Sequence, residues 1–108
     1  MNILFICSRN KWRSRTAENI FKSSPIHNIR SAGTAAGAQV KVSEKLLLWS
    51  ELIFVMEKRH KDQLKENFLA ALEGKEIIVL NIPDDYQYMD KELIEIIKTS
   101  VEPYFAYS

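Results

Sequence analysis

The sequence predicts an α/β domain of three layers, in which helices cover both faces of a four-stranded parallel sheet. Four short apolar runs alternate with stretches whose apolar residues recur at helical spacing, so a strand–helix pair repeats four times. The runs are continuous rather than alternating, which is typical of strands buried on both faces. A length of 108 residues fits one domain, and we expect residues 1–108 to form a single unit.

The first half of the chain supplies two strands and the helix between them. Residues 3–6 form the first apolar run, and a polar, basic stretch follows it. Apolar side chains then recur every three to four residues, at Ala17, Ile20 and Phe21. Pro25 ends this helical stretch, because proline cannot continue a helix. Residues 26–30 are the second predicted strand.

The second half supplies two further strands and three helices. Ser43 and Asp90 are predicted N-caps of a short and a terminal helix, and Gly74 is the predicted end of the helix between them. Residues 52–56 and 77–80 are predicted buried strands. The helical side chains expected to face the core are Leu46, Leu47 and Trp49, then Leu64, Phe68, Leu69 and Leu72, and finally Leu93, Ile94, Ile97, Val101 and Tyr104.

Composition narrows the classes of function. The formal net charge is +1, so nothing favours a nucleic acid or a membrane surface as a partner. Cys7 is the only cysteine, which excludes an intramolecular disulfide and a cysteine-rich zinc site. The first apolar run is too short for a signal peptide or a membrane span, so we expect a cytoplasmic protein. We expect His27 and His60 to be structural or at the surface.

The stretch from Cys7 to Ser14, which reads CSRNKWRS, carries the strongest chemical signal. A loop that leads from a strand into a helix N-terminus can present several backbone N–H groups to an anion. Arg13 can add two parallel hydrogen bonds to phosphate oxygens. The same positive surroundings favour the nucleophilic thiolate of Cys7, to which Ser14 can donate a hydrogen bond.

Two simpler interpretations compete with this one. A cysteine at the end of a buried strand is more often an inert packed thiol, and basic residues at a helix start usually form a solvated face. Cations at that position oppose the helix dipole unless an anion binds there, which favours a functional role. Asp84 also follows a predicted strand, so it should reach the same edge of the sheet as Cys7. Its alternative role is that of a turn or cap residue.

The chain resembles the low-molecular-weight protein tyrosine phosphatase family in several segments. Its phosphate-loop residues are Cys7, Asn10, Arg13 and Ser14, and Ala17-Glu18 follow as they do in the family. Further similar segments are residues 31–34 (SAGT), 52–60 (LIFVMEKRH) and 82–86 (IPDDY). The resemblance spans most of the chain in the correct order.

This resemblance implies hydrolysis of phosphotyrosine, on a protein or a small aryl phosphate, without a cofactor or a metal. Cys7 would attack phosphorus and form a phosphocysteine, Arg13 would hold the transition state, and Asp84 rather than Asp85 would act as general acid. The site would also bind phosphate, sulfate or vanadate. The implied phosphate- and substrate-binding residues are Ser8, Arg9, Asn10, Lys11, Trp12, Ser14 and Tyr86.

The chain departs from the family pattern at four places. Arg9 stands where the family usually has glycine, and a positive φ there would strain the loop. Trp12 replaces a second cysteine that can protect the nucleophile, and Asp85 replaces a proline of the acid loop. Residues 33–52 form a shorter stretch than in typical members, so the chain resembles a shortened member.

Three other functions stay open. A cysteine phosphocarrier of the sugar-transport IIB type also has a cysteine after its first strand, but it normally lacks an arginine at the position of Arg13. A non-catalytic phosphate-binding module would result if Arg9 or Asp85 disabled turnover. An arsenate reductase is disfavoured, because that chemistry generally recruits further cysteines.

Overall fold

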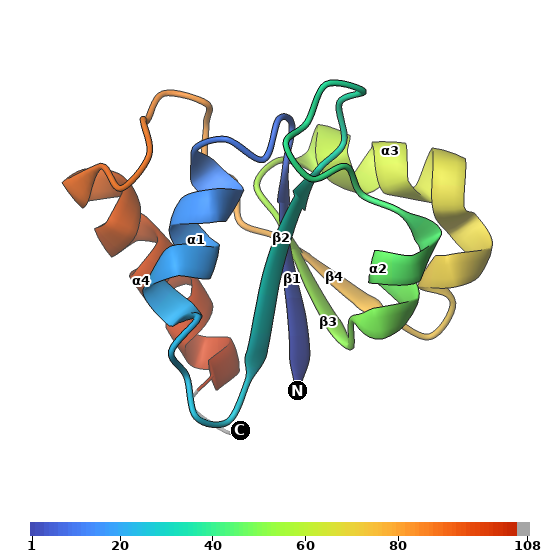
Figure 1. The fold of residues 1–108 in the computed structure, drawn as a ribbon, viewed down its shortest axis with the longest axis horizontal. Helices are drawn as coiled ribbons and strands as arrows, with labels where there is room; N and C mark the ends of the chain where they lie inside the picture. The colour runs from blue at the N-terminus through green and yellow to red at the C-terminus, as the bar shows by residue number, and fades with distance from the viewer. Residues whose placement is uncertain (106–108) are drawn as a thin grey trace.

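The computed structural model describes residues 1–105, in which strands and helices alternate as predicted (Figure 1). None of the helices in this part of the chain is long and apolar enough to cross a membrane. The strands are β1 (Asn2–Cys7), β2 (Asn28–Gly33), β3 (Leu52–Val55) and β4 (Glu76–Val79). The helices are α1 (Arg13–Phe21), α2 (Glu44–Trp49), α3 (Lys58–Phe68) and α4 (Lys91–Phe105), with a 3₁₀ turn at Leu69–Leu72.

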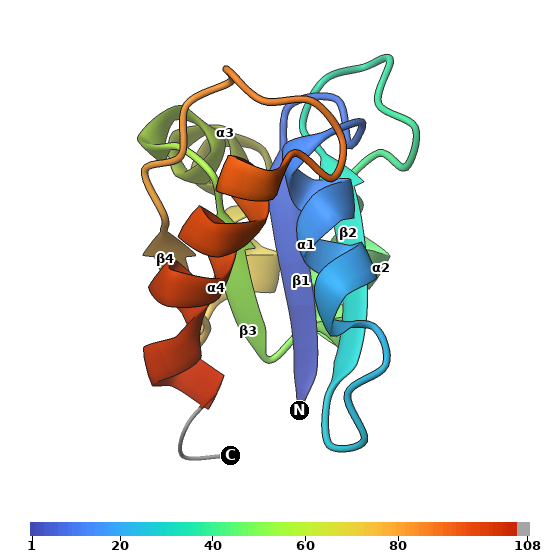
Figure 2. The same ribbon diagram turned by 90° about the vertical axis from the view of Figure 1, so that its left-hand side faces the viewer.

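The sheet is parallel throughout, with the strand order β2-β1-β3-β4. Helices α1 and α4 cover one face, and α2 and α3 cover the other (Figures 1 and 2). The chain leaves β1 toward the first face and β3 toward the second, so the connections diverge between these two central strands. Ligands bind at such a switch point, beyond the carboxyl ends of the strands. The loops after β1, β2 and β4 lie together at that end, at the top of Figure 1.

Strand β1 divides its side chains between two cores. Ile3, Phe5 and Cys7 pack on the side of α1 and α4, whereas Leu4 and Ile6 pack on the side of α2 and α3. Successive side chains of a strand point to opposite faces, so a strand covered on both faces is apolar at every position. This explains why the apolar run predicted the strand correctly.

The two predicted N-caps are confirmed. Ser43 Oγ accepts a hydrogen bond from the backbone N of Leu46 at 3.2 Å, and Asp90 Oδ1 accepts one from the backbone N of Leu93 at 3.1 Å. Gly74 follows the 3₁₀ turn with a φ of 75°, a conformation that glycine adopts at little cost.

The predicted bounds of β2 and α1 are wrong. Strand β2 begins at Asn28 and runs to Gly33, because pairing with β1 continues through the small residues, while Ile26 is exposed. Helix α1 ends at Phe21, four positions before Pro25, so proline is not what stops it.

Three predicted core positions are also wrong or only partly right. Helix α3 ends at Phe68, and the change to a 3₁₀ turn leaves Leu69 68% exposed rather than inward. Tyr104 is 40% exposed, although its ring contacts Phe54 edge-on, and Phe105 also packs against the first core. Trp49 is half-buried and lies beside Arg30. Within the described residues strand β4 pairs with β3 alone, so it is a half-buried edge strand.

Candidate active site

The loop between β1 and α1 is tied to the segment after β2 through its backbone carbonyls. In a trans peptide unit, the N–H group points in the opposite direction to the C=O group. Because the carbonyls of residues 7–9 face the segment after β2, the amides of residues 8–10 point away from that segment. Several N–H groups turned to one side of a loop can bind one anion. The bonds are from the backbone N of Thr34 to Cys7 O (3.0 Å), Ala35 to Ser8 O (2.8 Å) and Gln39 to Arg9 O (3.0 Å).

Gly33 allows this close approach. A Cβ at Gly33 would lie 2.4 Å from the backbone O of Ser8 and 2.8 Å from the backbone N of Asn10, which is far inside van der Waals contact. Any side chain at this position would therefore displace the loop. The glycine of the SAGT segment thus has a structural reason, which sequence reasoning did not supply.

Asn10 holds the loop from inside. It is buried and has a φ of 54°, while Arg9 is not among the left-handed residues of the described chain. The strain considered at Arg9 is therefore not present. Asn10 Nδ2 donates to Ser14 Oγ at 2.9 Å and to Ser31 Oγ at 2.8 Å, and Ser31 Oγ donates to Glu18 Oε1 at 2.6 Å.

Cys7 lies next to the start of α1. Its thiol is free, and the residue is 3% exposed. Its Sγ atom is 3.0 Å from Ser14 Oγ. Because Ser14 Oγ already accepts a hydrogen bond from Asn10, its own hydrogen is available to the sulfur of Cys7. This arrangement stabilises a thiolate by hydrogen bonding.

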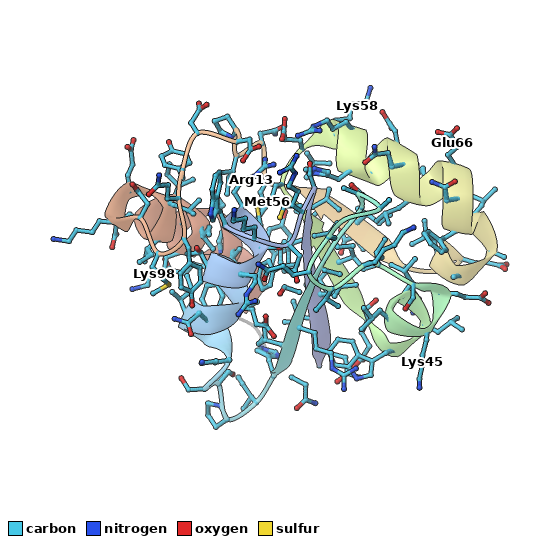
Figure 3. The ribbon with its side chains drawn as sticks, turned by 45° about the horizontal axis from the view of Figure 1, so that its top comes forward. Arg13, Lys45, Met56, Lys58, Glu66 and Lys98 are labelled. Atoms are coloured by element: carbon cyan, nitrogen blue, oxygen red, sulfur yellow. The ribbon has the colours of Figure 1, made fainter. Side chains whose placement is uncertain are left out.

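Arg13 is anchored by one edge of its guanidinium group. Nη1 donates to Glu57 Oε2 at 2.5 Å and to the backbone O of Ile82 at 2.8 Å, which uses both of its hydrogens. The opposite edge carries Nε and Nη2, the pair that can form two parallel hydrogen bonds to phosphate. Asp84 Oδ1 lies 3.6 Å from Nε. Arg13 is buried, and Figure 3 labels it between the helices of the two layers.

The first turn of α3 supports the loop from the other side. The side chains and backbone amides of Glu57 and His60 form a reciprocal capping box. His60 Nδ1 accepts from the Glu57 amide at 3.1 Å, so Nε2 carries the hydrogen and donates to Ser8 Oγ at 2.9 Å. Burial and the nearby Arg13 and Arg59 lower the pKa of His60 to about 4, so this ring is neutral near pH 7. His60 is structural, as expected.

These elements enclose a pocket of about 280 Å³, which we call the Cys7 pocket. Seven of its lining residues were singled out in the sequence, and Arg59 was not. Asn10 and Ser14 are buried and do not line it, and Tyr86 packs against the first core instead. The lining residues are Cys7, Ser8, Arg9, Lys11, Trp12, Arg13, Arg59 and Asp84.

Sequence reasoning also missed Glu57. The segment 52–60 was noted only as a resemblance, although Glu57 follows β3 almost directly. The signal that could have found Glu57 is its position just after a strand. Because β3 lies beside β1, both strands end at the edge of the sheet where Arg13 begins α1.

Replacing Glu57 with glutamine should lower stability in a pH-dependent way. Hydrogen bonds from Arg59 and Arg13 lower the pKa of Glu57 from 4.5 to about 2. The folded state thus favours the carboxylate, and its contribution is complete above pH 4.5 and is lost as pH falls toward 2. The gap in thermal unfolding midpoint between wild type and Glu57→Gln should be widest near neutral pH and should close in that range. Glu66→Gln, on the exposed side of the same helix, should track the wild type throughout.

Taken together, a thiol and an arginine on a strand-to-helix loop face a carboxylate across one pocket of a doubly wound parallel sheet, an arrangement that is chemically able to hold a phosphoryl group. No protein-family model matches the chain, and no curated protein matches it in sequence. Solved structures do match over nearly its whole length.

Three of these structures define the comparison. A low molecular weight protein tyrosine phosphatase from Streptococcus pyogenes matches with a TM-score of 0.82 and 17% identity, over 98% of this chain and 91% of that one. Vibrio vulnificus Wzb in complex with benzylphosphonate matches with a TM-score of 0.80 and 22% identity, over 99% and 98%. The YwlE arginine phosphatase of Geobacillus stearothermophilus matches with a TM-score of 0.73 and 19% identity, over 98% and 94%. The chain therefore has the fold of the low-molecular-weight protein tyrosine phosphatases, as its sequence motifs predicted.

Proposed function

We propose that the chain is a phosphatase that hydrolyses phosphotyrosine through a phosphocysteine intermediate. The observation that carries this proposal is the convergence in one pocket of the Cys7 thiol, the unanchored edge of Arg13 and the carboxyl group of Asp84. Each of these groups has a separate task in phosphoryl transfer. The likeness in fold to proteins named as phosphatases supports the same conclusion.

In the first step, the Cys7 thiolate attacks phosphorus while the bond from phosphorus to the phenolic oxygen breaks. Asp84, in its protonated form, gives its proton to that oxygen, and tyrosine leaves as a neutral phenol. The Nε/Nη2 edge of Arg13 and the amides of the loop hold the three equatorial oxygens of the transition state. Anchoring by Glu57 keeps the guanidinium group in place before substrate arrives.

In the second step, water attacks phosphorus, and Asp84 takes up the proton that the water releases. The bond between phosphorus and the sulfur of Cys7 breaks, orthophosphate forms, and the thiolate is regenerated. The hydrogen bond from Ser14 to that sulfur, over 3.0 Å, makes the thiolate a better leaving group. A thiol that must stay reduced suits the cytoplasm, which is where we place the protein.

Phosphoarginine is the second candidate substrate, because YwlE arginine phosphatases share the fold. Two features favour tyrosine. An arginine leaving group is cationic and would meet Arg9, Lys11 and Arg59 at the pocket, whereas a phenol is neutral. The half-buried ring of Trp12 also lines the pocket and offers a flat apolar face for a phenol ring.

Phosphate release from three substrates tests this proposal. Wild-type protein should hydrolyse p-nitrophenyl phosphate and a phosphotyrosine peptide, and a phosphoarginine peptide of the same sequence should be hydrolysed with a kcat/KM lower by about tenfold or more. Faster release from phosphoarginine would show that the site is an arginine phosphatase. No release from any of the three would favour the phosphocarrier or the binding module.

Asp84→Asn should reduce phosphotyrosine turnover by about 10²-fold, the usual scale of acid catalysis. A phenolate with a pKa of about 10 leaves poorly unless it is protonated, whereas more acidic leaving groups need little help. The loss should therefore shrink along a series of aryl phosphates with increasingly acidic leaving groups. Asp85→Asn is the matched control and should be milder on every substrate. A steeper leaving-group dependence for Asp85→Asn would transfer the acid role to Asp85.

A further inference from the structure

The lining of the Cys7 pocket contains more cations than carboxylates. Besides the buried Arg13, it is lined by Arg9, Lys11 and Arg59, which we call the rim cations. All three are exposed, and Asp84 is the single carboxylate among the described lining residues. The chain as a whole has a formal net charge of +1, so this excess is a local feature.

Arg59 is held in place from α3. Its Nη2 atom is 3.0 Å from Glu57 Oε2, and this hydrogen bond raises the pKa of Arg59, which keeps it protonated. The same carboxylate oxygen accepts the hydrogen bond from Arg13. One carboxylate thus serves two guanidinium groups, and both of these groups line the pocket.

The other two rim cations are placed by the loop itself. Lys11 Nζ lies 5.1 Å from the centre of the Trp12 ring, and the backbone O of Arg9 is fixed by the amide of Gln39 at 3.0 Å. Arg15 shows the contrast, since it is bound to Gln39 Oε1 and does not line the pocket. Like charges gathered at one mouth repel each other, and an anion bound between them removes that cost.

We propose that the rim cations bind carboxylate side chains on either side of the phosphorylated tyrosine, so that the substrate is an acidic segment of a protein. This inference rests on the proposed phosphatase function and names the substrate class of the same site. Arg13 and the loop amides suffice for the phosphoryl group. The rim cations come from two separate segments, the loop and α3, and several carboxylates along a peptide can engage both at once.

Peptide binding to the Cys7→Ser variant tests the role of the rim cations without turnover. Three peptides carry one phosphotyrosine flanked by glutamates, by alanines or by lysines. Exposed ion pairs are individually weak, so three of them should tighten binding of the glutamate peptide about tenfold relative to the alanine peptide at low salt. The lysine peptide should bind more weakly than either, and high salt should bring the three dissociation constants together.

Arg59→Gln, added to Cys7→Ser, should reduce the ratio between the glutamate and alanine peptides about threefold. Any loss of affinity that comes from disturbing Glu57 affects both peptides alike, so it cancels in the ratio of their dissociation constants. Lys58→Gln is the control, because Lys58 is an exposed cation on the same turn that does not line the pocket, and it should leave the ratio unchanged. Lys11→Gln is a second variant on the loop side and should act like Arg59→Gln.

Equal dissociation constants for the three peptides, or a ratio that neither Arg59→Gln nor Lys11→Gln changes, would overturn the inference. The hydrolysis of p-nitrophenyl phosphate by wild type separates this result from failure of the proposed function. Hydrolysis together with equal peptide affinities would refute only the proposal that the rim cations bind carboxylates. A preference for the glutamate peptide without hydrolysis would support that proposal and refute the proposed phosphatase activity.

Discussion

Cys7→Ser should lose essentially all phosphatase activity, by about 10⁴-fold or more in kcat, because a serine hydroxyl is not ionised near neutral pH and cannot replace the thiolate. Binding of phosphate should survive, since Arg13 and the loop amides are untouched. Steady-state hydrolysis of p-nitrophenyl phosphate, together with calorimetric titration of phosphate, measures both effects.

The intermediate itself can be trapped. Wild-type protein quenched in acid during turnover should carry one phosphoryl group on the peptide that contains Cys7, as mass spectrometry would show, and Cys7→Ala should carry none. Ser14→Ala is the informative companion variant, because it removes the hydrogen bond to sulfur but keeps the nucleophile. It should slow the breakdown of the intermediate and so increase the trapped fraction. A phosphoryl group found elsewhere would remove Cys7 from the mechanism.

Arg13→Lys should reduce kcat by about 10²-fold or more, which is roughly 3 kcal/mol of transition-state stabilisation. Lysine offers a point charge in place of two parallel N–H groups. The three N–H donors of lysine also cannot replace four bonds, because the guanidinium contacts Glu57 and the backbone O of Ile82 through Nη1 and offers both Nε and Nη2 to the pocket. Inhibition by vanadate should weaken in parallel.

Arg15→Lys is the matched control for this change. Arg15 is on the same helix, two residues further along, but it is exposed and hydrogen-bonded to Gln39 outside the pocket. We expect the activity of the Arg15→Lys variant to stay near that of the wild type. If Arg13→Lys kept activity within a few-fold of wild type, another group would have to hold the phosphoryl oxygens, and Arg59 would be the next residue to test.

Much of the architecture could be predicted because its signals are local. Strand β1 is apolar throughout since helices cover both of its faces, and Ser43 and Asp90 cap helices through bonds that reach only three residues ahead. The spacing of Cys7 and Arg13 lies within one loop, so its chemistry was visible without a fold. Boundaries were less predictable, because pairing with β1 extends β2 to Gly33 whatever the local preference.

The sequence by itself determined the parallel α/β architecture and the loop that carries Cys7 and Arg13. Only the tertiary structure decided what surrounds them. Arg13 meets Glu57 and Ile82 across 44 and 69 residues of chain, and these contacts depend on β3 lying beside β1 and on β4 lying beside β3. A single sequence contains no local pattern for such a meeting, because sheet order and register bring together the segments that follow different strands. Gly33 and Arg59 acquire their roles for the same reason.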